Sequence, residues 1–174
     1  MQKESDRAKK KKDEVREEEE FGTFQYADGS VYEGKICHRE GTLEIPHGAP
    51  VPVPSSPARG QQQLEPPVLY PFQHGKGIFK DAGGAIYDGG WSEGNMCGEG
   101  VIQFPSGAIY TGGIYINSFY GTGKYTWPDG SYYEGQWENN KMHGLGTYVD
   151  AEGRHWVGKF YQGRGVNLLA EISL

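Results

Sequence analysis

The chain has 174 residues, enough for one domain with tails, and its formal net charge of −6 argues against an obligate nucleic-acid binder, which would carry a basic face. Hydrophobic residues make up 36% of the chain, which is little for a layered core but adequate for a single sheet. No run approaches the roughly 20 apolar residues that span a bilayer, and two cysteines without a signal-like segment lead us to expect a reducing, cytoplasmic setting.

Residues 1–20 are almost wholly charged, with seven Lys/Arg and eight Asp/Glu. Such a segment cannot bury enough apolar surface to offset its ordering entropy, so we predict a disordered charged tail, with a lone solvated helix as the alternative. The basic run Arg7–Lys12 could act as a nuclear-import patch or as a contact to an anionic membrane. Glu17–Glu20 lie within about a Debye length of this run and weaken its field, which favours a solvated tail.

Residues 21–49 are predicted to hold a first hairpin repeat and a degenerate second one. In the first, Thr23–Tyr26 is followed by an Ala-Asp-Gly turn and by the triplet Tyr32-Glu33-Gly34. Residues 41–49 then align with residues 100–108, although a clear partner strand for this second copy does not follow.

Residues 50–72 hold seven of the ten prolines. One interpretation is a turn insertion within the second repeat, whose second strand would be Leu64–Val68. Two adjacent prolines would remove ladder donors from that strand and confine it to an edge. The other interpretation is a proline-rich linker between one amino-terminal repeat and the later ones. The run Pro54-Ser55-Ser56-Pro57 is also a minimal PxxP motif.

Residues 73–165 repeat four times at a fixed interval of 23 residues. Each copy has a Gly-x-Gly pair, then a turn glycine, then an aromatic-x-Gly pair. The Gly-x-Gly pairs begin at Gly75, Gly98, Gly121 and Gly144, and the aromatic-x-Gly pairs at Tyr87, Tyr110, Tyr133 and Trp156. Landmarks that keep register over four copies indicate a repeat architecture.

Each copy is predicted to be a β-hairpin. Alternating polar and apolar residues in Gly123–Trp127 and Tyr133–Trp137 predict two strands, with Pro128–Gly130 as the turn between them. Because one hairpin is unstable alone, we predict an all-β fold, an elongated single-layer antiparallel sheet of tandem 23-residue hairpins. The glycines of the aromatic-x-Gly pairs should leave space for a ring, and they are Gly89, Gly112, Gly135 and Gly158.

Residues 166–174 are predicted to form a C-terminal cap. Gly165–Leu169 would add a half-repeat strand, and apolar Leu168–Leu174 would cover the open end of the sheet.

Residues 133–148, YEGQWENNKMHGLGTY, resemble the MORN repeat (membrane occupation and recognition nexus), whose pattern is roughly YxGxWxxxxxHGxGxxxxxxG. The resemblance runs in register from Gly75 to Gly158 and in weaker form back to Phe21. It implies a small MORN-repeat protein without an attached enzyme domain. Because this module serves unrelated tasks, the resemblance specifies the fold more than the function.

No catalytic or cofactor-binding motif occurs in the sequence. His74, Cys97, Tyr120 and His143 share one repeat position, which could suggest a metal. Equivalent residues of adjacent hairpins lie about 10 Å apart, too far to share a zinc ion whose ligands lie within about 2.3 Å. We therefore predict no enzyme activity, no cofactor and no metal site.

A single layer leaves the aromatic face of the sheet without a covering layer, so this face is the candidate for binding a partner helix or extended peptide. The rings could also simply fill the concave side of a curved sheet. The predicted partner-binding residues are Tyr87, Trp91, Tyr110, Tyr125, Trp127, Tyr133, Trp137, Tyr148 and Trp156.

Three classes of function are open. The resemblance implies a non-catalytic scaffold for protein binding, cytoskeletal or axonemal, in a cilium or sperm flagellum. The first alternative is a peripheral membrane adaptor for acidic phospholipids, which ten Lys/Arg against fifteen Asp/Glu in residues 21–174 disfavour. The second alternative is a regulatory subunit that acts in trans on an enzyme.

Overall fold

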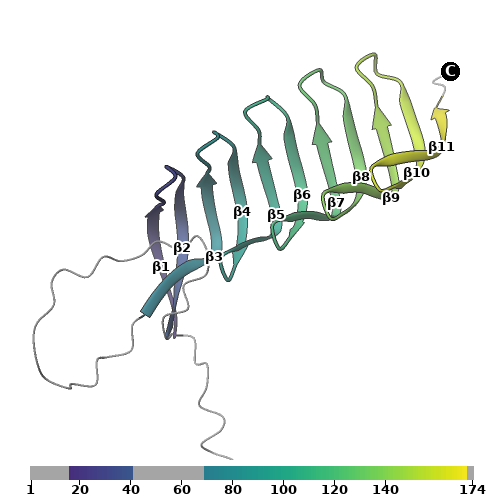
Figure 1. Cartoon of the computed structure of the whole chain (residues 1–174). Helices are drawn as coiled ribbons and strands as arrows, with labels where there is room; N and C mark the ends of the chain where they lie inside the picture. The colour runs from purple at the N-terminus through teal and green to yellow at the C-terminus, as the bar shows by residue number, and fades with distance from the viewer. Residues whose placement is uncertain (1–15, 41–68, 172–174) are drawn as a thin grey trace, which may run out of the picture.

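The computed structural model describes residues 16–40 and 69–171, which form one open antiparallel sheet of eleven strands. Strands that are neighbours in the chain are neighbours in the sheet, from purple β1 to yellow β11 in Figure 1. The strands are β1 (Arg16–Gln25), β2 (Val31–Glu40), β3 (Leu69–Lys80), β4 (Ile86–Ser92), β5 (Asn95–Gln103), β6 (Ile109–Tyr115), β7 (Ser118–Thr126), β8 (Tyr132–Glu138), β9 (Lys141–Val149), β10 (His155–Tyr161) and β11 (Arg164–Glu171). The predicted single-layer fold is confirmed. Within these ranges no helix is long and apolar enough to cross a membrane.

Five-residue turns join the two strands of each predicted hairpin. In the turn from Trp127 to Ser131, the backbone N–H of Trp127 donates to the Ser131 carbonyl at 2.9 Å. The N–H of Gly130 donates back to the Trp127 carbonyl, with Gly130 at a φ of 87°. The same two bonds close all five such turns, so a proline or alanine followed two positions later by glycine marks each of them.

Two-residue turns, which the sequence pattern did not indicate, close the opposite end of the sheet. Both residues of each turn have positive φ, the type I′ geometry that suits the right-handed twist of a hairpin. These turns are Glu93-Gly94, Ile116-Asn117, Asn139-Asn140 and Gln162-Gly163. Asn139 and Asn140 are favourable here because asparagine tolerates the left-handed region better than most residues.

The tight turns correct the predicted strand limits. The first strand of the best copy was predicted as Gly123–Trp127, yet β7 runs from Ser118 to Thr126. β7 continues through the Gly-x-Gly pair at Gly121 and Gly123. Gly121, at a φ of 77°, lies at the irregularity where the register of β7 against β6 shifts, so the strand is not interrupted there. Trp127 itself belongs to the turn, and β8 extends the predicted second strand by one residue at each end.

A row of ten paired glycines crosses the sheet from β1 to β10. Each is the cross-strand partner of the next, and they are Gly22, Gly34, Gly77, Gly89, Gly100, Gly112, Gly123, Gly135, Gly146 and Gly158. A Cβ atom added at Gly135 would lie 2.5 Å from the Cα of Gly146 and 2.6 Å from the hydroxyl of Tyr133. The row therefore leaves room for tyrosine rings to lie against backbone.

The two ends of the sheet differ from the limits predicted from sequence. β1 begins at Arg16, so residues 16–20 extend a strand that we had assigned to the charged tail. At the other end, β11 pairs with β10. Leu168 contacts Gly158 and Gly165 there, in the place that tyrosine takes in other repeats.

β2 and β3 pair directly with one another, although 28 residues (41 to 68) separate them in the chain. Tyr32 is opposite Phe79 and Gly34 is opposite Gly77, the same register that joins later repeats. Residues 41–68 therefore connect two neighbouring strands. The degenerate repeat at 41–49 and the alternative strand at Leu64–Val68 lie outside the described residues.

Candidate interaction surface on the aromatic face

Four tyrosines form the interior of the aromatic face. Each folds back over the glycine pair of its own repeat, and its hydroxyl donates to the carbonyl oxygen three residues ahead. These bonds join Tyr32 to Lys35 (2.6 Å), Tyr87 to Gly90 (2.7 Å), Tyr110 to Gly113 (2.7 Å) and Tyr133 to Gln136 (2.9 Å). All four side chains are at most 2% exposed, so a partner cannot reach them in the folded protein.

Burial also changes the acidity of these hydroxyls. Because the tyrosinate anion would lose its hydration, burial raises the pKa of Tyr32, Tyr87 and Tyr133 to about 12. Burial raises the pKa of Tyr110 as well, and the nearby Glu99 carboxylate adds to this shift.

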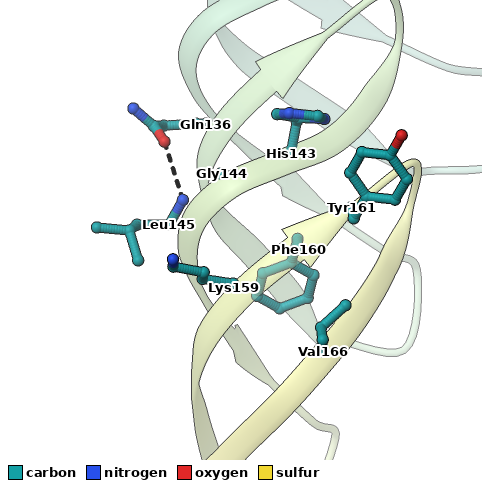
Figure 2. A pocket seen from close by; sticks show the side chains of 8 residues that line it. All are labelled: Gln136, His143, Gly144, Leu145, Lys159, Phe160, Tyr161 and Val166. Carbon is teal, nitrogen blue, oxygen red and sulfur yellow. Dashed lines mark hydrogen bonds between the residues drawn. The ribbon is translucent and has the colours of Figure 1, made fainter.

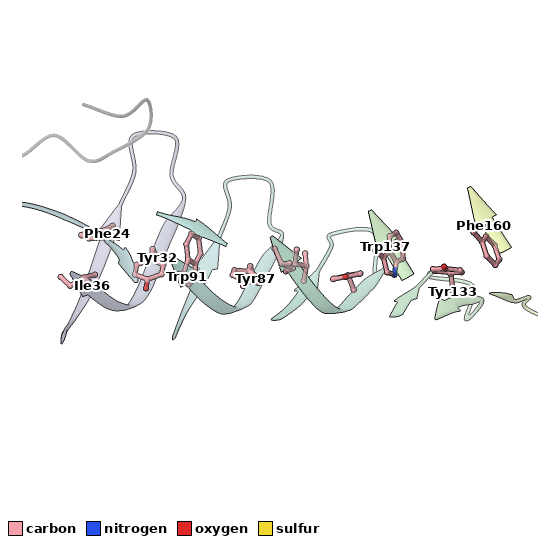
Figure 3. Close-up of a cluster of buried hydrophobic side chains, with 11 residues drawn as sticks. Phe24, Tyr32, Ile36, Tyr87, Trp91, Tyr133, Trp137 and Phe160 are labelled. Atoms are coloured by element: carbon pink, nitrogen blue, oxygen red, sulfur yellow. The ribbon is translucent and has the colours of Figure 1, made fainter. Parts of the chain in front are cut away.

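Two tryptophans are wedged between these tyrosines. Trp91 meets the rings of Tyr32 and Tyr87 edge to face, with centroids 5.1 and 5.4 Å away, and Figure 3 shows it between them. Trp137 meets Tyr110 and Tyr133 in the same way, at 5.4 and 5.2 Å. Both indoles are 7% exposed, and their N–H groups donate to the carbonyls of repeat glycines. They are core residues as much as surface residues.

The accessible aromatic surface lies over strands β5 to β9. Tyr125 is the centre of a half-buried cluster, with ring centroids 5.9 Å from Phe104, 6.5 Å from Phe119 and 4.9 Å from Trp127. Trp127 in turn lies 5.8 Å from Tyr148. These five side chains are all partly exposed.

A shallow groove of about 240 Å³ opens within this cluster. We call it the aromatic groove, lined by Phe119, Tyr125, Trp127, Trp137, Asn140, Lys141, Met142 and Gly163. Its walls are mainly ring and thioether atoms, and Lys141 is the only charged residue on them. Such a surface suits an apolar or weakly polar ligand.

The nine predicted binding residues thus separate into two groups. Five are buried: Tyr87, Trp91, Tyr110, Tyr133 and Trp137. The other four are partly exposed: Tyr125 and Trp127 line the groove, and Tyr148 contacts Trp127 beside it. Trp156 lies in β10 with its indole N–H 3.4 Å from a carboxylate oxygen of Asp150. The binding role of all nine stays a prediction.

Sequence reasoning missed Phe119 and Met142 of the groove. Phe119 stacks on Tyr110 with ring centroids 3.7 Å apart. It takes the repeat position held by Met96 and Met142, so the 23-residue period could have identified these residues. They were missed because the strand was predicted to begin after Gly121.

A second hollow, of about 610 Å³, lies beside β9 and β10. Figure 2 shows its lining, in which the side-chain oxygen of Gln136 accepts the backbone N–H of Leu145. The ring of His143 lies 5.5 Å from that of Tyr161, and its Nδ1 is 3.3 Å from a Glu138 oxygen, at an angle that makes no hydrogen bond. Within residues 16–40 and 69–171 no three His, Cys, Asp or Glu side chains gather to hold a metal ion.

Comparison with known families gives one match. The model of the MORN repeat family matches residues 19–31, 87–109, 121–132 and 133–153. These stretches cover most of β1 with its turn, nearly all of β4, all of β5, part of β7, and β8 and β9, whereas β3, β10 and β11 lie outside them. No curated protein matches the sequence.

Proposed function

The chain carries MORN repeats in tandem, and we propose that it is a non-catalytic scaffold that binds a segment of a partner protein in the aromatic groove. The MORN repeat is in general a non-enzymatic module for protein or membrane interaction. The observation that carries the proposal is the cluster around Tyr125, Trp127 and Tyr148. Its rings are partly exposed, and within the described residues no second layer covers them.

Ring burial should supply most of the affinity. Tryptophan and tyrosine bury much area at low entropic cost and are frequent hot spots of interfaces. The partner segment that fits is a helix or an extended peptide, because the groove is small, about 240 Å³, and has Phe119 and Trp127 among its lining residues. We extend the proposal to a cytoplasmic setting at the cytoskeleton, in the axoneme of a cilium or flagellum, which the family resemblance supports.

Trp127→Ala is the variant that tests this function. Trp91 and Trp137 are unsuitable because both are buried and hydrogen bonded, so truncating them would unfold the sheet. Proximity labelling in ciliated cells would first identify partners, with axonemal or tubulin-associated proteins expected. Binding of the strongest candidate, as purified protein, should weaken by about 2 kcal/mol or more in Trp127→Ala.

Tyr161→Ala is the matched control. Tyr161 is 63% exposed, and it lies on the opposite face of β10 from Phe160. This variant should bind normally, and circular dichroism should be unchanged in both. Equal binding by folded Trp127→Ala and by wild type would refute the groove. Binding to anionic vesicles that is abolished by salt would instead support the membrane adaptor.

A further inference from the structure

The last strand of the sheet, β11, is paired on one side only. β3, β5, β7 and β9 hold the same place in their repeats, and each of them has a neighbour on both sides. Among the described strands, none lies beyond β11, at the yellow end of the sheet in Figure 1. The outer edge of β11 is therefore a row of backbone N–H and C=O groups with which a further strand could pair.

An irregularity within β11 does not close this edge. The register of β10 against β11 shifts between Val157 and Lys159, and Asn167 of β11 has a φ of 50° there. β9 has the same shift against β8, with Gly144 at a φ of 64° in the corresponding place. β9 nevertheless pairs with β10 on its other side, so β11 can accept a strand in the same way.

Two apolar side chains of β11 are exposed on the face opposite the aromatic groove. Val166 and Leu169 are paired with Lys159 and Val157, two residues of one face of β10. The shift in register therefore places Val166 and Leu169 on the same face, although three positions separate them. Val166 is 46% exposed and Leu169 is 75% exposed, the highest value among the large hydrophobic residues that the structure describes. A strand added at the edge would cover part of both.

The direction of the strands decides which end of a second copy fits this edge. Every strand of the sheet runs opposite to its neighbour, so β1 and β11, both odd-numbered, run in the same direction. With the aromatic faces of two copies on one side, β1 of a second copy would add to β11 in parallel. β11 of a copy turned about a twofold axis would add antiparallel, as every other pair in the sheet does.

We propose that a second copy of this chain pairs its β11 with this edge, antiparallel and around a twofold axis. The register sets Asn167 of one copy opposite Leu168 of the other, at the centre, and so matches all eight residues of the strand. Val166 of each copy is then opposite Leu169 of the other. Two valine–leucine contacts across the strands cover the exposed side chains.

This register also keeps each face of the sheet continuous. Gly165 and Ala170 are paired with Phe160 and Trp156, which belong to the aromatic face of β10. The register sets Gly165 of one copy opposite Ala170 of the other, one small residue against another. A slip by one residue would set residues of the aromatic face opposite residues of the other face.

The sequence of β11 is complementary to itself in charge. It begins with Arg164 and ends with Glu171. In an antiparallel pair the start of one strand meets the end of the other, so each arginine position is opposite a glutamate position. Opposite charges in facing positions favour pairing, and like charges oppose it.

The dimer goes beyond the proposed function, because it places two aromatic grooves on one side of a continuous sheet. Trp137 of the groove is in β8, three strands from β11. The two grooves would thus be seven strand spacings apart, roughly 34 Å at about 4.8 Å per strand. A partner with two suitable segments could occupy both grooves, which raises its affinity without any new contact.

Sedimentation velocity of the full chain over a range of concentrations tests the association. A strand of eight residues forms a small interface, so we expect a reversible dimer with a dissociation constant of about 1–100 μM. Its mass should be twice the 19.3 kDa of one chain. Amide hydrogen exchange of the wild type gives a second measurement that needs no variant. Protection of β11 should increase from dilute to concentrated protein, and protection of β1, the other edge, should not.

Two double variants test the register. Val166→Lys with Leu169→Lys sets like charges opposite one another in the two copies, whereas Val166→Glu with Leu169→Lys sets opposite charges there. The second should associate about tenfold or more tightly than the first. Loss of apolar area alone would weaken both alike. Leu145→Lys, at a side chain that is 62% exposed two strands away, is the control and should associate as wild type does.

Several results would overturn the proposal. They are a monomer at every concentration with unchanged protection of β11, and equal association of the two double variants with circular dichroism spectra like that of wild type. Growth beyond the dimer would also overturn it, because a twofold contact is closed. Trp127→Ala should dimerise as wild type does. The dimer and the groove therefore stand or fall separately.

Discussion

The ring of Tyr133 occupies the space that a side chain at Gly146 would need. A Cβ atom built on Gly146 would lie 2.5 Å from Cε2 of Tyr133, far inside contact distance. Gly146 is paired with Gly135 across β8 and β9, so one tyrosine excludes side chains from two strands at once. The same relation recurs for Tyr32 with Gly77, Tyr87 with Gly100 and Tyr110 with Gly123.

Gly146→Ala should therefore destabilise the sheet. The new methyl group must displace a buried ring that is hydrogen bonded at its far end, an overpacking cost of about 1–3 kcal/mol. Chemical denaturation measures this loss. Thr122→Ala, at an exposed strand position, is the control and should cost much less. Equal midpoints for the two variants would show that the ring moves away freely.

Tyr133→Phe should cost about 1–2 kcal/mol although the ring stays. The hydroxyl donates to the Gln136 carbonyl and lies 3.3 Å from the His143 carbonyl, and its loss removes a buried hydrogen bond to the backbone. Thermal denaturation of both proteins measures the loss. Tyr161→Phe, which removes a hydroxyl from an exposed side chain, is the control and should leave the melting temperature unchanged. A neutral Tyr133→Phe would mean that water replaces the hydroxyl.

The protein should unfold as the pH rises from about 10 toward 12. Burial raises the pKa of Tyr32, Tyr87 and Tyr133 to about 12, against the ordinary value of 10.0. Below pH 10 both folded and unfolded chains keep these protons, so the stability is intact. Above it the unfolded chain loses protons first, and the free energy of unfolding falls.

Tyrosinate absorbance and circular dichroism, followed together, check this prediction. The buried tyrosines should ionise only within the unfolding transition. Ionisation of all twelve tyrosines with an unchanged circular dichroism spectrum would contradict it.

Ser131→Ala should raise the pKa of Asp129. The Ser131 hydroxyl (2.6 Å) and backbone N–H (3.0 Å) both donate to one Asp129 oxygen. These bonds hold the pKa of this carboxyl below its ordinary value of 3.8. The stability that these two bonds give the folded protein is fully present above pH 3.8, the ordinary pKa of the carboxyl. It is lost as the pH falls through the lowered pKa of Asp129 in the folded protein. Carbon-detected NMR titration measures the shift. Asp28, which makes the same two bonds with Ser30, should not change.

The sequence by itself determined the class of fold and much of its interior. A 23-residue period with alternating strands and fixed glycines allows hardly any other structure, because a single hairpin can bury its aromatic face only against its neighbours. That Tyr133 and Trp137 share one face followed from alternation alone. The place of the turn at Pro128–Gly130 was also predictable, because proline and glycine have few other uses at that spacing, although the observed turn extends to Trp127 and Ser131.

Only the tertiary structure decided which rings remain accessible. Alternation assigns Tyr133 and Tyr125 to one face, yet Tyr133 is buried and Tyr125 is partly exposed. The difference arises because the ring of Tyr133, unlike that of Tyr125, lies over the paired glycines of β8 and β9, Gly135 and Gly146. The pairing of β2 with β3 joins residues far apart in sequence, and no local pattern specifies such a contact. It depends on a matching register of glycines on the two strands, with Gly34 opposite Gly77.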